Sequence, residues 1–150
     1  FGKGKKPGRL IDKMSFAGHN KGWSPPRTAF DWLTRDEAIV DQYVADPYCG
    51  FPFTGSAYRD LFRGLKRLYP KNLSAMEKDV PVRLFSGAAD PVGKQGEGVK
   101  ATMKELLDAG VEDVSLKLYD GGRHEMLNEV ERDTVLNDLI QWVNEYVPAR

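Results

Sequence analysis

The chain has 150 residues, of which 41% are hydrophobic and 29% charged, and its 22 basic side chains balance 22 acidic ones. These values are those of an ordinary globular domain, and without a cationic excess we expect no nucleic-acid partner. Cys49 is the only cysteine, which excludes an intrachain disulfide. No apolar run approaches the ~20 residues that span a bilayer, and no signal peptide is recognisable, so we expect a cytoplasmic protein with no transmembrane segment.

Residues 1–79 are predicted to be helical, with no strand. Residues 2–8 are interpreted as a flexible, solvated lead, and a short helix follows over 9–16. The glycines and prolines of 18–26 indicate a loop. Thr34 and Glu37 match a capping box, which predicts the start of a helix that runs to about Val44. Apolar side chains at helical spacing predict another helix over about 56–69.

Residues 80–150 read as strand, helix, strand, helix. The strands are expected at 82–86 and 114–119, and Gly110 can close the helix between them as a left-handed cap. A last helix carries an apolar side made of Val135, Leu136, Leu139, Ile140, Val143 and Val147. Two strands joined by a helix pair in parallel through a right-handed crossover. A parallel sheet of two strands is marginal, so we expect it to be the edge of a larger sheet whose other strands lie outside this chain.

Two polar residues follow the two predicted strands. Asp90 comes shortly after the first strand and His124 shortly after the second, and catalytic groups of open α/β sheets collect at this edge. Taken singly, an Asp before Pro is a common turn former and a His after two glycines is a common loop residue. Together, in the order Asp then His, they indicate the acid and base of a catalytic triad, since α/β-hydrolases carry Ser, Asp and His in that order.

Three stretches resemble one protein family. The run PVRLFSGAADPVGKQGEGV resembles the acid-bearing segment of α/β-hydrolases of the bacterial lysophospholipase and monoacylglycerol lipase type, serine aminopeptidase S33-type hydrolases. LKLYDGGRHEMLNE is similar to their histidine segment. RTAFDWLTRDEAIVDQYVADPYCGF is similar to their helical lid. The resemblance implies the C-terminal part of an α/β-hydrolase fold, with a helical cap or lid over residues 1–79 and the βαβα end of the core over 80–150.

The resemblance implies that Asp90 is the triad acid, that His124 is the general base, and that carboxylic esters are cleaved. The nucleophile elbow of such enzymes is G-x-S-x-G, and no serine of this chain has glycine at both of those positions. We therefore expect no nucleophile in this chain, and no turnover by this chain alone. The serine and the oxyanion loop are expected in an N-terminal half, supplied by the same gene or by a second chain.

The aromatic residues of the first half are expected to form mainly its core. Phe51 and Phe53 flank Pro52 in a loop and are the best candidates for lining an acyl-chain channel, since lipase-type sites are apolar. Cys49 is interpreted as a small buried apolar residue rather than a nucleophile. His19 is interpreted as a loop residue, and two distant histidines predict no metal site. No cofactor is expected.

Two other hypotheses remain open. The chain could belong to a hydrolase-like binding or scaffold module that has lost its elbow, or it could be a complete small α/β domain with an unrelated role. An upstream G-x-S-x-G segment and labelling by a fluorophosphonate would distinguish the hydrolase from both. The expected partners are a lipid-like ester substrate and the N-terminal half, and exposed strand edges also allow a homodimer.

Overall fold

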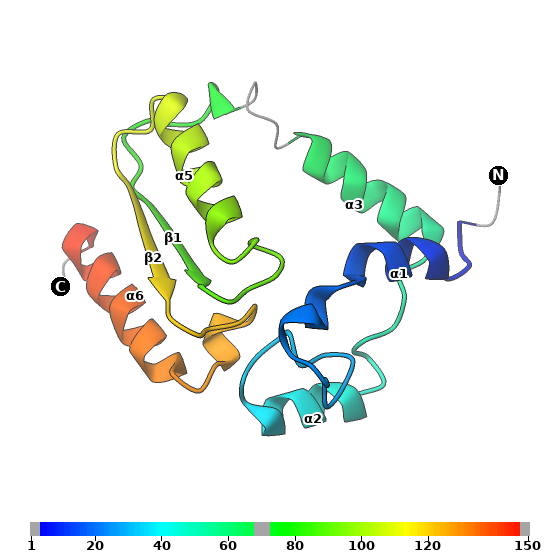
Figure 1. Cartoon of the computed structure of the whole chain (residues 1–150). Coiled ribbons are helices and arrows are strands. Elements are labelled where there is room, and N and C mark those ends of the chain that lie inside the picture. The colour runs from blue at the N-terminus through cyan, green and yellow to red at the C-terminus, as the bar shows by residue number, and fades with distance from the viewer. Residues whose placement is uncertain (1–3, 68–72, 148–150) are drawn as a thin grey trace.

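A computed structural model describes residues 4–67 and 73–147 of the chain. The elements of residues 4–67, the helical part, are α1 (Arg9–Phe16), η1 (His19–Gly22), α2 (Glu37–Ala45) and α3 (Gly55–Arg67). Those of residues 73–147, the sheet part, are β1 (Val82–Gly87), α5 (Glu97–Asp108), β2 (Val114–Tyr119), η2 (Met126–Asn128) and α6 (Arg132–Tyr146). The two parts lie side by side, and the loop after β2 faces the segment before α2 (Figure 1).

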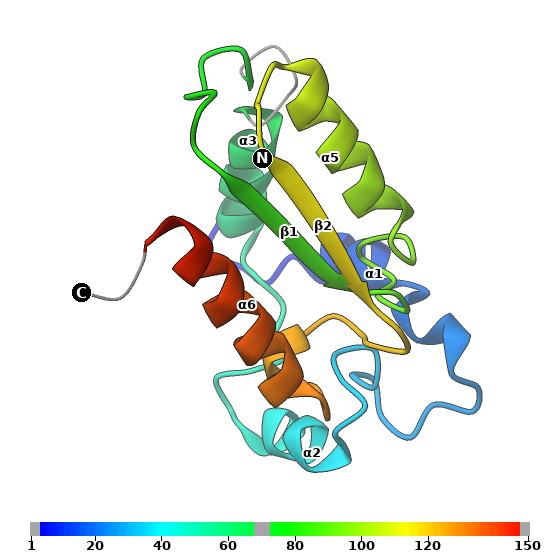
Figure 2. The same cartoon turned by 90° about the vertical axis from the view of Figure 1, so that its left-hand side faces the viewer.

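Within the described residues the sheet consists of β1 and β2, which pair in parallel with Val82 opposite Val114 and Gly87 opposite Tyr119. Both strands were predicted from sequence, and the parallel pairing is confirmed. Helices α5 and α6 lie on opposite faces of this sheet, which gives three layers (Figure 2). Because the strands are parallel and in register, the loops that follow them leave the sheet at the same edge.

The sheet part has a small core. Tyr119, Met126 and Val135 form its buried cluster, and Phe85 and Leu139 pack against it. The predicted apolar side of α6 is only partly covered, since Ile140 is 57% exposed and Val143 46% exposed. A sheet of two strands is too narrow to cover the whole stripe of a 15-residue helix.

The loop after α5 is the left-handed cap that the sequence predicts. Gly110 has φ of +91°, and its amide donates to the Leu107 carbonyl while the Val111 amide donates to the Leu106 carbonyl. These two bonds make a Schellman motif, which satisfies carbonyls at the end of α5 and turns the chain towards β2. On α5, Leu106 is buried whereas Leu107 is 44% exposed, so the predicted apolar face is again partly covered.

The helical part confirms three predicted helices. α1 has the predicted bounds, and α2 ends where Asp46 precedes Pro47. α3 was expected to end near residue 69, which lies outside the described residues. The loop prediction for 18–26 is corrected at η1, because the amides of Lys21 and Trp23 donate to carbonyls three residues earlier and form a 3-10 turn.

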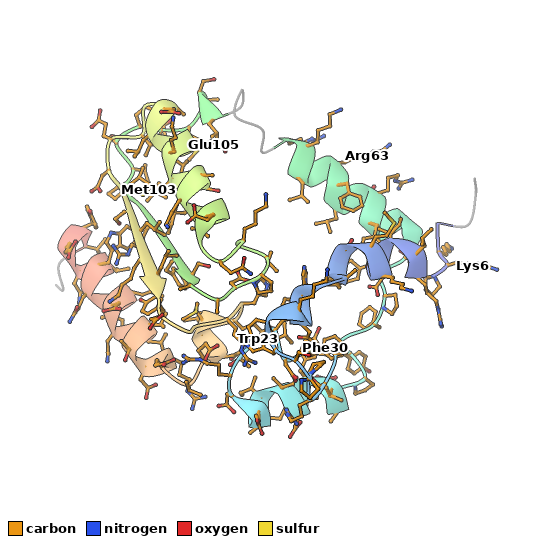
Figure 3. The ribbon with its side chains drawn as sticks, in the orientation of Figure 1. Lys6, Trp23, Phe30, Arg63, Met103 and Glu105 are labelled. Atoms are coloured by element: carbon orange, nitrogen blue, oxygen red, sulfur yellow. The ribbon has the colours of Figure 1, made fainter. Side chains whose placement is uncertain are left out.

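The lead predicted for residues 2–8 is exposed over residues 4–7, as expected, but its described main chain is paired rather than free. The Gly8 amide donates to the Phe53 carbonyl at 2.8 Å, the Gly55 amide to the Lys6 carbonyl at 3.0 Å, and the Ser56 amide to the Gly4 carbonyl at 2.9 Å. Residues 4–8 thus lie along the segment before α3. The side chain of Lys6 still extends into solvent (Figure 3). Pairing over about 50 residues leaves no local signal in the sequence.

The predicted capping box at Thr34 and Glu37 is also wrong. The N-cap of α2 is Asp36, whose carboxylate accepts from the amides of Ala38 and Ile39. The Thr34 hydroxyl donates instead to the Asn128 carbonyl at 2.9 Å. Asp is as good an N-cap as Thr, and the tertiary contact to Asn128 leaves Asp36 to cap the helix.

Candidate active site

The loops after β1 and β2 are hydrogen-bonded to each other through main-chain atoms. The Ala88 amide donates to the Tyr119 carbonyl at 2.8 Å, and the Ala89 amide donates to the Gly122 carbonyl at 2.9 Å. At Gly87 a Cβ atom would lie 2.1 Å from the Gly122 oxygen and 2.2 Å from the Arg123 oxygen. Only glycine allows this approach, which brings the next residues of both loops together.

This approach places Asp90 against His124. The imidazole Nδ1 lies 3.2 Å from both carboxylate oxygens of Asp90. Asp90 is buried, 6% exposed, and its Oδ1 also accepts from the Val92 amide at 2.9 Å. The predicted proximity of the two residues is confirmed, whereas their catalytic roles stay predictions.

Hydrogen bonding favours the charged form of both Asp90 and His124. Burial alone would raise the pKa of Asp90, but hydrogen bonds from His124 and from the amides of Val92 and Gly93 outweigh it and lower that pKa. The hydrogen bond to Asp90 raises the pKa of His124 against the opposing effect of burial. An ionised carboxylate can only accept, so the neutral imidazole carries its proton on Nδ1. Nε2 then has a free lone pair and can act as a base.

Hydrogen bonds and ring contacts with the helical part hold the His124 loop in place. The His124 amide donates to the Trp32 carbonyl at 3.4 Å and the Glu125 amide to the Leu33 carbonyl at 2.7 Å. The Trp32 ring lies 5.1 Å from the His124 ring between centroids. The guanidinium of Arg123 lies 4.3 Å above the ring of Trp23, which is labelled in Figure 3. His124 therefore lies at the boundary between the two parts of the chain.

A hollow of about 470 Å³ lies beside the pair, bounded by β1 and the η2 turn. It is lined by Phe85, Ser86, Asp90, His124, Glu125, Met126, Leu127 and Asn128. Ser86 lies within β1, and its buried hydroxyl is 3.3 Å from the Gly87 carbonyl oxygen. Its position inside a strand agrees with the interpretation that it is not an elbow serine.

His19 lies close to the same site. Its ring is 4.7 Å from the Trp32 ring and 5.5 Å from the Phe16 ring. Burial, followed by repulsion from His124, lowers its pKa, and attraction to Asp90 only partly opposes this. The second histidine of the chain is therefore favoured in its neutral form.

A larger cavity of about 490 Å³ lies within the helical part. Its wall includes both residues that sequence reasoning selected, Phe51 and Phe53, together with Phe30, Tyr43 and Trp32. One residue of this wall, Trp32, also packs on His124. Most of the lining is aromatic or apolar, which is typical of a site for an apolar ligand.

Cys49 is also part of that wall, and it is half-buried rather than fully buried as predicted. Desolvation, followed by the neighbouring Asp46, raises the pKa of the thiol. A raised pKa keeps the group protonated, which disfavours a nucleophilic role.

Within residues 4–67 and 73–147, no three His, Cys, Asp or Glu side chains gather in a way that could hold a metal ion. None of the helices described there combines the length and the apolar character needed to cross a bilayer.

The sequence matches the serine aminopeptidase S33 family over residues 4–131. The chain belongs to this family. A monoacylglycerol lipase of Mycolicibacterium smegmatis is 31% identical over 117 residues, which cover 75% of this chain and 38% of the relative. The S33 family membership confirms the resemblance seen in the sequence.

Solved structures agree with the S33 assignment. A thermostable carboxyl esterase from Bacillus coagulans, solved with glycerol, superposes with a TM-score of 0.87 at 26% identity, covering 96% of this chain and 47% of the esterase. A lipase in its open form gives a TM-score of 0.83 at 28% identity, covering 99% of this chain and 49% of the lipase. The chain is thus a partial α/β-hydrolase fold that spans about half the length of these structures. The predicted fold class is confirmed.

Sequence reasoning missed several residues that shape this S33 site. Gly87 was noted only as the end of a strand and Trp32 only among the aromatic residues of the first half, although both touch the His124 loop. Glu129 was also missed, and it is fully buried behind that loop. Glu129 lies in the stretch that carried the family resemblance, but a single glutamate gives no signal that it is buried.

Proposed function

We propose that this chain supplies the acid, the base and the lid of a serine hydrolase that cleaves carboxylic esters of long-chain lipids. The observation that carries the proposal is the 3.2 Å contact between Nδ1 of His124 and the carboxylate of Asp90. Membership of a family whose relatives include a carboxyl esterase and a monoacylglycerol lipase supports the reaction class.

The geometry supports the following chemistry. A serine hydroxyl from the nucleophile elbow attacks the ester carbonyl while Nε2 of His124 takes its proton. The same Nε2–H then protonates the leaving alcohol as the carbon–oxygen bond of the ester breaks. Water repeats the two steps and releases the fatty acid. Asp90 fixes the tautomer of His124 and stabilises the imidazolium that forms in each transition state.

The nucleophile comes from a segment other than those described. We infer that it enters the hollow beside β1, because that hollow is lined by both Asp90 and His124. The partly exposed apolar residues of α6 and α5 also favour further covering by protein. We therefore infer that the principal partner of this chain is the N-terminal half of the hydrolase, either in the same polypeptide or as a second chain. A homodimer is the alternative.

The substrate class follows from the cavity of the helical part. A space of about 490 Å³ with aromatic walls lies within the usual range for small-molecule sites. Trp32 separates this space from His124 and contacts both, so we infer that an acyl chain lying there would have its ester group on the side of Trp32 that faces His124. Phe51 and Phe53 would then contact the chain, as predicted from their loop.

The test uses the polypeptide that joins this chain to its G-x-S-x-G segment. We expect a fluorophosphonate to label it, and a monoacylglycerol to be hydrolysed. His124→Gln should lower kcat by about 10⁶-fold, on the scale seen when the histidine of a triad is removed. His19→Gln is the matched control and should keep labelling and most of the turnover. Lipid binding without labelling would instead support the inactive binding module.

Chain-length preference tests the acyl cavity separately. Phe53→Ala should lower kcat/KM for a long-chain ester by about 10-fold while leaving an acetate ester nearly unchanged, because only the long chain loses apolar contact. Phe62→Ala is the control, since Phe62 is similarly exposed on α3 but does not line the cavity. Equal effects of both variants on both esters would remove the cavity from the proposal.

A further inference from the structure

Glu129 is a buried carboxylate with an unusually complete set of donors. It is 0% exposed. Its Oε1 accepts from the main-chain amides of Arg35 at 3.1 Å and Arg123 at 2.9 Å. Its Oε2 accepts from Nε of Arg35 at 3.0 Å and from the amide of Val130 at 3.1 Å. Burying a carboxylate is costly unless its oxygens are satisfied, and here both are.

The donors come from the two segments that meet at the base. Arg123 is the residue before His124, and the amide that Glu129 accepts belongs to the main chain that carries the imidazole. Arg35 ends the stretch whose earlier carbonyls, at Trp32 and Leu33, accept from the amides of His124 and Glu125. The hydrogen bonds to the Glu129 carboxylate and these main-chain hydrogen bonds together join the His124 loop to the helical part.

Arg123 adds a second link across the same boundary. Its guanidinium donates to the carbonyls of Asp31 and Thr34. The Thr34 hydroxyl in turn donates to the Asn128 carbonyl, next to Glu129. These three bonds, like those from Arg35 to Glu129, join residues about 90 apart in sequence, so removing the Glu129 acceptor loosens the contact between the helical part and the loop of His124.

We propose that Glu129 is a positioning residue: through the Arg123 amide and Arg35 it sets the place of His124 against Asp90 and couples the base to the lid. The inference rests on the proposed function only in treating His124 as the base. Glu129 contacts no reacting atom and transfers no proton. A carboxylate suits this place because it accepts only, and all four groups that contact its oxygens are N–H donors.

Glu129→Gln tests the inference in the 150-residue chain. The change keeps the shape but turns one acceptor oxygen into a donor that faces donors. Glu131→Gln is the matched control, because Glu131 also pairs with Arg35 but its side chain is 44% exposed. The readout is the NMR titration of the two imidazoles. We expect Glu129→Gln to move the titration of His124 down towards that of an ordinary histidine, while Glu131→Gln leaves it as in the wild type.

Kinetics of the polypeptide that carries the elbow give a second readout. A displacement of the base of about 1 Å costs about 10²-fold, so Glu129→Gln should lower kcat by about that factor for a short-chain ester while KM changes less than about threefold. Glu129→Asp, which keeps the charge but shortens the reach, should fall between Gln and the wild type. It also carries the test if the Gln variant does not fold.

Three outcomes of these measurements decide whether Glu129 positions His124. A lowered thermal midpoint with the His124 titration and kcat unchanged in the folded variants would overturn the inference and leave Glu129 a purely structural ion pair. Equal effects of Glu129→Gln and Glu131→Gln would overturn it as well. A shifted His124 titration in a protein that no fluorophosphonate labels would support the positioning role and contradict the proposed hydrolase, so the two failures are distinguishable.

Discussion

Gly87→Ala is the substitution with the largest predicted effect for the smallest chemical change. The new Cβ would lie 2.1 Å from the Gly122 carbonyl oxygen, whereas such contacts are not found below 3.0 Å, so the two loops must separate by about 0.9 Å, the difference. Both obstructing atoms belong to the main chain, which cannot rotate aside as a side chain can. Carried to the next residues, that separation takes the 3.2 Å contact between Asp90 and His124 to about 4 Å, beyond hydrogen-bond distance.

Overpacking of this kind costs about 1–3 kcal/mol, which lowers the thermal midpoint of a chain of this size by about 4–8 °C for a cost of about 2 kcal/mol. The assay combines thermal unfolding by circular dichroism with the NMR titration of His124, whose pKa should fall. Gly64→Ala is the control, since its Cβ meets nothing within 4 Å in the interior of α3 and should stabilise by about 0.5–1 kcal/mol. Wild-type values of both midpoint and titration in Gly87→Ala would refute the reasoning.

Two more predictions concern pH and the α5 cap. The raised pKa of His124 gives stability that is present below the unfolded-state pKa and is lost as pH rises through the folded-state pKa, whereas the lowered pKa of His19 gives stability that is lost as pH falls. In His19→Gln, which keeps His124, the free energy of unfolding measured in urea around neutral pH should therefore fall as pH rises. In His124→Gln, which keeps His19, it should rise with pH. Slopes of the same sign in both variants would contradict the assignment. Gly110→Ala should lower the free energy of unfolding, measured in urea, by about 1–2 kcal/mol, because φ at this position is +91°. The nearest side-chain atom, Cδ of Lys78, would be 4.0 Å from the new Cβ, so backbone strain is the cause. A change below about 0.3 kcal/mol would mean that the loop adapts.

Much of the fold was predictable because its signals are local. The strands after Pro81 and Asp113 and the Gly110 cap depend on residues within a few positions of each other. The N-cap of α2 was misassigned because Thr34 and Asp36 are both good caps, and the choice between them is made by Asn128, 94 residues away. The main-chain pairing of residues 4–8 with 53–56 has the same origin.

The candidate site divides in the same way. Asp90 and His124 could be paired because each follows a strand and parallel strands end at one edge. The groups that hold them could not be found. The buried state of Glu129 depends on Arg35, and the contact of Trp32 with His124 depends on how the helical part lies on the sheet part. Neither follows from spacing along the chain.

The contact between the carboxylate and the imidazole is tested most directly by titrating His124 in the wild type and in Asp90→Asn, with His19→Gln in both to leave one histidine signal. The bonded carboxylate raises the pKa of His124, so the wild-type imidazole should titrate above the ordinary histidine value of about 6.5 and the Asn variant distinctly lower. An imidazole that titrates at its ordinary value and ignores the loss of the carboxylate would contradict the pairing on which the proposed reaction depends.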